Sequence, residues 1–296
     1  MPPLLALMRE LFTLAPLPAH AGFWAVVLFM FGACIGSFLN VCIYRLPRGL
    51  SLSNPRRSFC FTCKTPIAWY DNLPLVSYLW LGGRCRHCET PYSMRYFWVE
   101  LATGLLFAAG LFLFGADLVP LCVYLALASS LTVVFLIDVD RQIIPDSISL
   151  GGLAAGLLFS CVAWLVPLSP RLPVQHPGEA LLGAAVGYGV LWIVRWAGTL
   201  LFRKEAMGLG DLKLLAMLGS WIGWESALYT VVLSAFLGSV VGIAGKLVAL
   251  ARKQGYGALT EVPYGPYLSL AGLFAFIYSD ALHRFFTMVI LREGVA

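Results

Sequence analysis

The sequence predicts an all-α polytopic membrane protein with about eight transmembrane helices and one small extramembrane insert. Hydrophobic residues make up 60% of the chain and charged residues only 12%, whereas a typical soluble domain is about 25% charged. Apolar stretches long enough to span a bilayer recur along the sequence. Only one stretch between them, residues 45–96, is long enough to hold structure of its own.

The expected membrane spans are residues 23–44, 97–115, 118–137, 148–168, 180–202, 211–224, 227–250 and 264–282. The first is interpreted as a retained helix, because its apolar core is too long for a signal peptide and no cleavage site follows it. The sixth is short and has Lys213 near its start, so it is expected to be partial or tilted. Three domains follow: a first helix (1–44), the insert (45–96) and a transmembrane core (97–296).

Basic residues predict which side of the membrane holds the insert. Most of the 20 Lys and Arg residues lie in the insert or in loops on the same side by alternation of the spans. Because cytoplasmic loops are enriched in Lys and Arg, this side is expected to be the cytoplasm. Both chain termini are then expected on the opposite side.

Four cysteines in the insert form two Cys-x-x-Cys pairs, Cys60 with Cys63 and Cys85 with Cys88. Two such pairs supply the four thiolates of a tetrahedral structural zinc site. One alternative is a pair of disulfides, which the cytosol disfavours. The other is a redox Cys-x-x-Cys motif, but two copies without a thioredoxin-like βαβ pattern argue against it. Because about 50 residues can bury little core, a metal is expected to hold this small zinc-binding cytoplasmic insert together.

Asp138 ends the apolar run Leu-Thr-Val-Val-Phe-Leu-Ile-Asp138. An ionisable group at such a position costs several kcal/mol and is rarely kept without a function. Pro145 cannot continue the preceding helix, so a tight cytoplasmic turn is expected with Asp138 on its apolar side. Asp140 is expected to be exposed, and Asp146 or Ser147 to be the N-cap of the next helix. Whether Asp140 or Asp146 tunes Asp138 is left open.

Asp211 follows two glycines in the sequence Gly208-Leu-Gly210-Asp211-Leu-Lys213. Because glycine has no side-chain bulk, an extended substrate backbone can approach the carboxylate closely. A Gly-x-Gly pair is also typical of helix packing or of a turn, and no phosphate-binding or dinucleotide fingerprint follows it. Lys213 is expected to neutralise a nearby acid or a phospholipid.

Asp138 and Asp211 are predicted to meet, because both lie at cytoplasmic ends of their apolar segments. Two adjacent carboxyl groups share a proton, so one can activate a water while the other polarises a peptide carbonyl. This predicts an aspartic peptidase. The sequence contains no His-Glu-x-x-His, so metalloprotease chemistry has no support. Two alternatives remain: a proton-coupled transporter with the aspartates as relay groups, and a non-enzymatic scaffold whose insert docks a partner.

The chain closely resembles the bacterial type IV prepilin peptidases, which are bifunctional leader peptidases and N-methyltransferases. The resemblance covers nearly the whole chain. Its motifs are, in order, Gly36-Ser-Phe-Leu-Asn40, the two cysteine pairs, Trp69-Tyr-Asp71-Asn72-Leu-Pro74, Arg95-Tyr-Phe-Trp-Val-Glu100, the Asp138 turn, Gly208-Leu-Gly210-Asp211 and Val262-Pro-Tyr-Gly265-Pro266. One departure is Phe61, which stands where proline is usual after the first cysteine.

The resemblance implies a membrane aspartic peptidase with Asp138 and Asp211 as catalytic residues and a structural zinc ion on the four cysteines. Such enzymes remove the basic leader of type IV prepilins or type II secretion pseudopilins after a glycine. They then N-methylate the new terminus with S-adenosylmethionine, and they lie in the bacterial inner membrane with the active site facing the cytoplasm. No nucleic-acid partner is expected, and the oligomeric state is left open.

Two questions remain open within the resemblance. A peptidase-only enzyme is the alternative to the bifunctional one, although preflagellin peptidases of that kind lack the cysteine-bearing insert. The residues of the methyl-transfer site do not follow from the sequence. Arg45, Asn72 and Glu100 are each compatible with such a site and equally with a capping or snorkelling role.

Overall fold

The computed structural model describes residues 17–54, 57–203, 207–251 and 263–289. This described part is helical, and its extended structure is limited to two isolated β-bridges in the insert. The all-α prediction is therefore confirmed. The described residues form two compact units that divide after Val133, here called the N-terminal unit and the C-terminal unit. The three predicted domains group residues by function rather than by contact, and that division stays a prediction.

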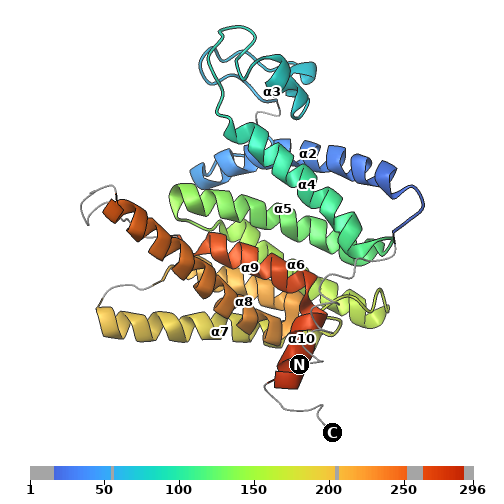
Figure 1. The fold of residues 1–296 in the computed structure, drawn as a ribbon, viewed down its shortest axis with the longest axis vertical. Coiled ribbons are helices and arrows are strands. Elements are labelled where there is room, and N and C mark those ends of the chain that lie inside the picture. The colour runs from blue at the N-terminus through green and yellow to red at the C-terminus, as the bar shows by residue number, and fades with distance from the viewer. Residues whose placement is uncertain (1–16, 55–56, 204–206, 252–262, 290–296) are drawn as a thin grey trace. The chain divides into compact units, whose positions relative to one another are not determined.

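The N-terminal unit consists of a helix pair, the insert and the first part of a third long helix. Helix α2 packs along α4 at small residues, as in many membrane proteins. A Cβ on Gly36 would lie 2.8 Å from the Cα of Glu100, so this close approach requires glycine. Figure 1 shows the insert at one end of the α2–α4 pair. The elements are α2 (Ala21–Arg45), η1 (Leu46–Arg48), η2 (Trp69–Asn72), α3 (Val76–Trp80), α4 (Arg95–Phe114) and α5 (Leu118–Arg141).

The C-terminal unit is a helical bundle in which α8 packs against α6, α7 and α9. The backbone of α8 leaves the helical conformation at Gly223, where φ is 78° and ψ is 171°. This break falls where the sequence predicted two successive spans. The elements are the end of α5, then α6 (Asp146–Leu165), α7 (Pro177–Phe202), α8 (Leu209–Ala251), α9 (Gly265–Ile277) and α10 (Ser279–Val289).

The last predicted span, residues 264–282, is wrong as a single helix. Helix α9 ends at Ile277, because Tyr278 leaves the helical conformation with φ −112° and ψ 25°. A helix of 13 residues is about 20 Å long, shorter than the hydrocarbon core of a bilayer. The separate helix α10 then begins at Ser279. The total of eight spans stays a prediction. The predicted orientation of the chain in the membrane rests partly on basic residues after position 251, and these lie outside the described residues.

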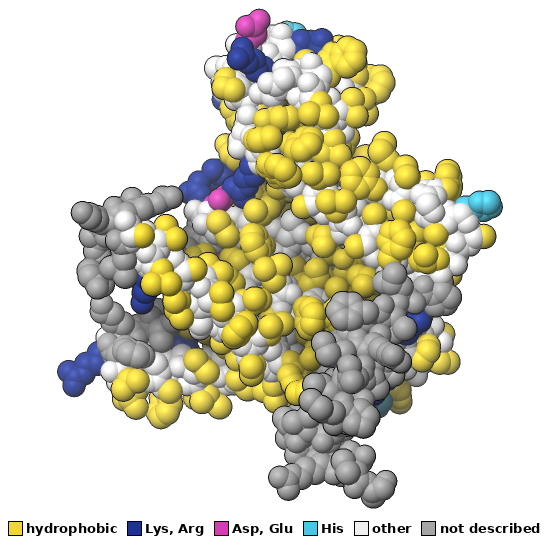
Figure 2. Space-filling view, viewed as in Figure 1, with side chains coloured by type: hydrophobic (Ala, Val, Ile, Leu, Met, Phe, Trp, Pro, Cys, Tyr) yellow, Lys and Arg dark blue, Asp and Glu magenta, His cyan; other side chains and the backbone are white. Residues whose placement is uncertain are grey.

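Six helices of the described chain are long and apolar enough to cross a membrane: α2, α4, α5, α6, α7 and α8. Their outer faces expose large apolar side chains, such as Phe31, Trp164 and Phe236. Figure 2 shows hydrophobic side chains spread over much of this face, with few charged side chains, some of them on the insert. An apolar surface of this extent indicates contact with lipid rather than with water. The chain is therefore a multi-pass membrane protein.

Candidate active site and metal centre

The two cysteine pairs of the insert have the same backbone turn. The Cys60 N–H donates to the Thr65 carbonyl at 3.0 Å, and the Cys85 N–H donates to the Thr90 carbonyl at 2.9 Å. The residue after each pair adopts a left-handed conformation, with φ of 60° at Lys64. Two equivalent turns thus direct four thiols toward one point.

The four cysteine sulfurs form a cluster that can hold a metal ion. All of them lie within 4.8 Å of one another. The Cys60 and Cys88 sulfurs are 3.7 Å apart, and those of Cys63 and Cys85 are 4.0 Å apart. Tetrahedral zinc with bonds of about 2.3 Å to sulfur requires neighbouring sulfurs roughly 3.8 Å apart. A disulfide requires about 2.05 Å, so the geometry favours the metal over the disulfide alternative.

Hydrogen bonds stabilise the thiolate form that a metal requires. The Thr65 side chain is the main group that lowers the pKa of the Cys63 thiol. The equivalent threonine of the second turn, Thr90, does the same for Cys88. Cys88 Sγ and Thr90 Oγ1 are 3.3 Å apart. The repeated threonine therefore prepares one thiolate in each pair.

The two aspartates are buried on different helices of the C-terminal unit. Asp138 lies in the last turn of α5 and is 5% exposed, and Asp211 lies in the first turn of α8 and is 9% exposed. The Asp138 carboxyl group lies close enough to act electrostatically on Asp211. The structure therefore brings the two sequence-predicted carboxyl groups into one buried site.

Gly265 fixes the Asp138 carboxyl group. Its N–H donates to Asp138 Oδ2 at 3.0 Å, across 127 positions of sequence. A Cβ on Gly265 would lie 2.7 Å from the same oxygen, so only glycine leaves room for it. Ile144 completes the wall, because a Cβ on Gly210 or Gly265 would come within 3.0 Å or 3.2 Å of its side chain.

Asp211 is held by the start of its own helix. The N–H of Gly208, the residue before α8, hydrogen-bonds to the Asp211 carboxyl group. An acidic third residue that accepts from the N-cap N–H is one half of a capping box. Tyr264, the residue before Gly265, interacts electrostatically with Asp211. Its hydroxyl is 2.5 Å from Ser234 Oγ. Neither the Gly265 contact nor the Tyr264 contact was identified from the sequence.

The turn after α5 differs from the sequence prediction at the point where α6 begins. Pro145 is the N-cap of α6, with φ −64° and ψ 127°, and Asp146 is the first helical residue. The interpretation of Asp146 or Ser147 as the N-cap is therefore wrong, because proline provides the required extended conformation one residue earlier. Asp146 instead accepts from Lys213 Nζ at 2.7 and 2.9 Å, which identifies the acid that Lys213 neutralises.

We expect Lys213→Met to lower the free energy of unfolding by at most about 1 kcal/mol, because exposed ion pairs contribute no more than that. Asp146 is 58% exposed and Lys213 31% exposed, so water screens their attraction. Unfolding of the purified variant and of wild type in the same detergent measures the effect. A loss of several kcal/mol would instead show that this pair is needed to hold α6 against α8.

Comparison with known proteins gives consistent matches over most of the chain. Residues 30–114 match the model of the bacterial peptidase A24 N-terminal domain, and residues 125–243 match that of the type IV leader peptidase family. The prepilin leader peptidase/N-methyltransferase of Aeromonas hydrophila is 38% identical over 283 residues, which cover 88% of this chain and 92% of that protein. The protein of the same name from Klebsiella pneumoniae is 44% identical, over 72% of this chain and 91% of that protein. The one from Pseudomonas putida is 39% identical, over 91% of this chain and 95% of that protein. No solved structure gives a significant match.

Proposed function

Because this chain belongs to the type IV leader peptidase family, we propose that Asp138 and Asp211 are the catalytic pair of a prepilin leader peptidase that is also an N-methyltransferase. The observation that carries the assignment is the pair itself: two buried carboxyl groups on separate helices, close enough to interact electrostatically. The names of its relatives and the match to the N-terminal domain favour the bifunctional enzyme over a peptidase without methyltransferase activity.

The proposed reaction is hydrolysis by two aspartates that share a proton. The ionised carboxylate removes a proton from a water, which attacks the peptide carbonyl, and the protonated carboxyl group donates to the carbonyl oxygen. The proton taken from the water then passes to the leaving amine as the carbon–nitrogen bond breaks, and the proton on the carbonyl oxygen returns to the other aspartate. The Gly265 N–H holds the Asp138 carboxyl group in one orientation, which keeps the pair ready for the reaction.

The proposed substrates are type IV prepilins or type II secretion pseudopilins. In such a substrate a short basic leader precedes an apolar helix, so the scissile bond after glycine lies at the membrane surface. Asp138 and Asp211 lie at the ends of apolar helices, which matches this depth. We place the protein in the bacterial inner membrane, with the insert and the aspartates facing the cytoplasm, on the basis of the basic residues of the insert.

Zinc is the proposed metal of the insert, and its role there is structural. Four cysteine ligands fill a tetrahedral coordination sphere and leave no position for water. The metal would therefore hold the two turns together and take no part in hydrolysis. The methyl donor proposed for the second reaction is S-adenosylmethionine.

We expect Cys88→Ser to reduce bound zinc from about one ion per chain to near zero, because a structural site needs all four ligands. Metal analysis of the purified protein by mass spectrometry measures the effect. Cys122→Ser is the matched control, since Cys122 is an exposed cysteine outside the cluster. Full zinc content in the Cys88 variant would show that the cluster is not the site.

The experiment that tests the function uses purified, detergent-solubilised enzyme and a purified prepilin, with S-adenosylmethionine present. Mass spectrometry is expected to show loss of the leader and the added mass of one methylene group at the new terminus. An intact substrate would contradict the peptidase. Cleavage without added mass would leave a peptidase that is not a methyltransferase.

A further inference from the structure

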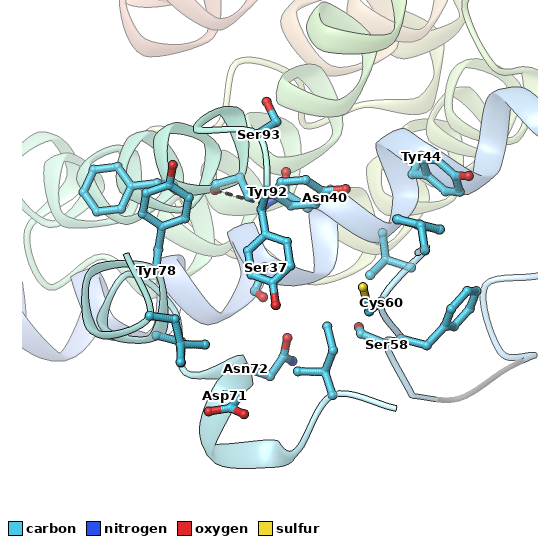
Figure 3. Close-up of a pocket in the computed structure, with 18 of the residues that line it drawn as sticks. Ser37, Asn40, Tyr44, Ser58, Cys60, Asp71, Asn72, Tyr78, Tyr92 and Ser93 are labelled. Atoms are coloured by element: carbon cyan, nitrogen blue, oxygen red, sulfur yellow. Dashed lines mark hydrogen bonds between the residues drawn. The ribbon is translucent and has the colours of Figure 1, made fainter. Parts of the chain in front are cut away.

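A cavity of about 600 Å³ lies in the N-terminal unit, bounded by α2, α4 and the insert. Figure 3 shows it from within, with Ser37 and Asn40 of α2 beside Asn72 and Tyr92 of the insert. Its volume falls in the range of roughly 300–1,000 Å³ that is usual for small-molecule sites. No residue of the aspartate site lines it, so a second ligand has a separate place to bind.

The cavity contains a buried carboxyl group. Glu100 is 9% exposed, and its Oε2 accepts the Leu75 N–H at 2.8 Å. Ser37 also interacts with this carboxyl group. A carboxylate has about four lone-pair sites, so it retains capacity for a ligand. Because positive charge and hydrogen-bond donors stabilise a buried carboxylate, this side chain favours a ligand that carries positive charge or hydroxyl donors.

The insert supplies a polar wall of the cavity, and the turn of the second cysteine pair, Cys85 and Cys88, supports this wall. In Figure 3 the Asn72 side chain and the Tyr92 hydroxyl point toward one another across the cavity. Asp71, next to Asn72, accepts from Arg86 at 2.8 and 2.5 Å. Arg86 lies between Cys85 and Cys88, so the position of Asn72 depends on the second cysteine pair.

Aromatic rings line two sides of the cavity. Tyr44 of α2 packs on Phe61 with ring centroids 4.7 Å apart, and Tyr78 packs on Phe97 at 5.6 Å. Aromatic faces stack on purine bases and attract cations. A ligand with a planar base and a positively charged centre therefore fits this lining.

The sequence left open whether Arg45, Asn72 and Glu100 belong to a methyl-transfer site. Asn72 and Glu100 present ligand-binding groups to this cavity, and Arg45 does not. Arg45 borders the cavity, but its Nη1 donates to the carbonyls of Ser51 and Leu52 at 2.9 and 3.2 Å. It therefore stabilises the chain after α2. Asn72 and Glu100 provide the polar groups for a ligand.

We propose that this cavity binds the methyl donor S-adenosylmethionine, with Glu100 beside its positive charge and the aromatic pairs against its adenine. The inference rests on the methyltransferase function proposed above. In the transfer, the lone pair of the substrate's terminal amine forms a bond to the methyl carbon while the carbon–sulfur bond breaks. The bond's electrons return to sulfur, which gives the neutral thioether, and the amine releases a proton to solvent.

Binding of the stable product, S-adenosylhomocysteine, tests this site without turnover. Calorimetry on the full chain in detergent compares wild type with Asn72→Ala and Glu100→Gln. We expect each variant to bind the product at least tenfold more weakly than wild type. Glu179→Gln is the matched control, because Glu179 is an exposed glutamate at the start of α7.

Ultraviolet cross-linking of labelled S-adenosylmethionine to wild type gives a second readout that requires no variant to fold. The label is expected in the segments that line the cavity, residues 37–45, 58–62, 67–78 or 92–100. Wild-type binding in both variants, or label confined to other segments, would overturn the proposed location and leave the methyltransferase function intact. A wild type that cuts but neither binds the product nor methylates would overturn the methyltransferase function itself.

Discussion

Asp138→Asn and Asp211→Asn are each expected to abolish leader cleavage, with a loss of roughly 10²–10⁴-fold or more. An amide can neither take a proton from water nor donate one as a carboxylic acid does, so either substitution removes one of the two roles. Asparagine is almost the same size as aspartate, and both sites are buried. The folded state should therefore persist. Mass spectrometry of a purified prepilin measures the loss.

Asp140→Asn is the matched control for these variants. Asp140 lies two residues after Asp138 on the same helix but is exposed. Substitution at an exposed position usually has a small effect, so cleavage by this variant should remain close to wild type. If Asp140→Asn lost activity and Asp138→Asn kept it, the catalytic carboxyl group of α5 would be that of Asp140.

Gly265→Ala is expected to reduce cleavage by about 10²-fold, the usual effect of a misplacement of about 1 Å in an active site. The added Cβ would lie 2.7 Å from Asp138 Oδ2 and 3.0 Å from its Cγ. Alanine keeps the backbone N–H that donates to this oxygen. The variant therefore tests the space around the carboxyl group separately from its hydrogen bond.

Gly189→Ala is the control for the glycine substitution. Gly189 lies in α7, and a Cβ there would meet nothing within 4 Å. Alanine is also the better helix former by roughly 1 kcal/mol, so this variant should be as stable as wild type and as active. Wild-type cleavage by Gly265→Ala would show that Asp138 is free to move and that Gly265 does not fix it.

The sequence predicts those parts of the site in which the chemistry lies close together along the chain. Each Cys-x-x-Cys pair is a local motif, and its spacing alone indicates a metal. The burial of Asp138 likewise follows from the apolar run that precedes it. The break at Gly223 falls at the predicted boundary between the spans 211–224 and 227–250.

The remainder depends on contacts between distant residues. The hydrogen bond from Gly265 to Asp138 joins positions 127 residues apart, and the Lys213–Asp146 pair joins positions 67 apart. A single sequence contains no periodic signal for such pairs. The family motif around Gly265 marked the segment without revealing what the glycine does. In the same way, Asn72 and Glu100 were noticed from the sequence, but only the cavity shows that they share a site.

The most direct test of the central claim, that Asp138 and Asp211 act as one catalytic pair, compares both single variants with the double variant. Initial rates of prepilin cleavage are measured in one detergent preparation, with zinc content as the check on folding. Because residues that act as a unit have non-additive effects, each single variant is expected to fall to the background rate and the double variant no lower. A single variant that cuts within tenfold of wild type would contradict the pair.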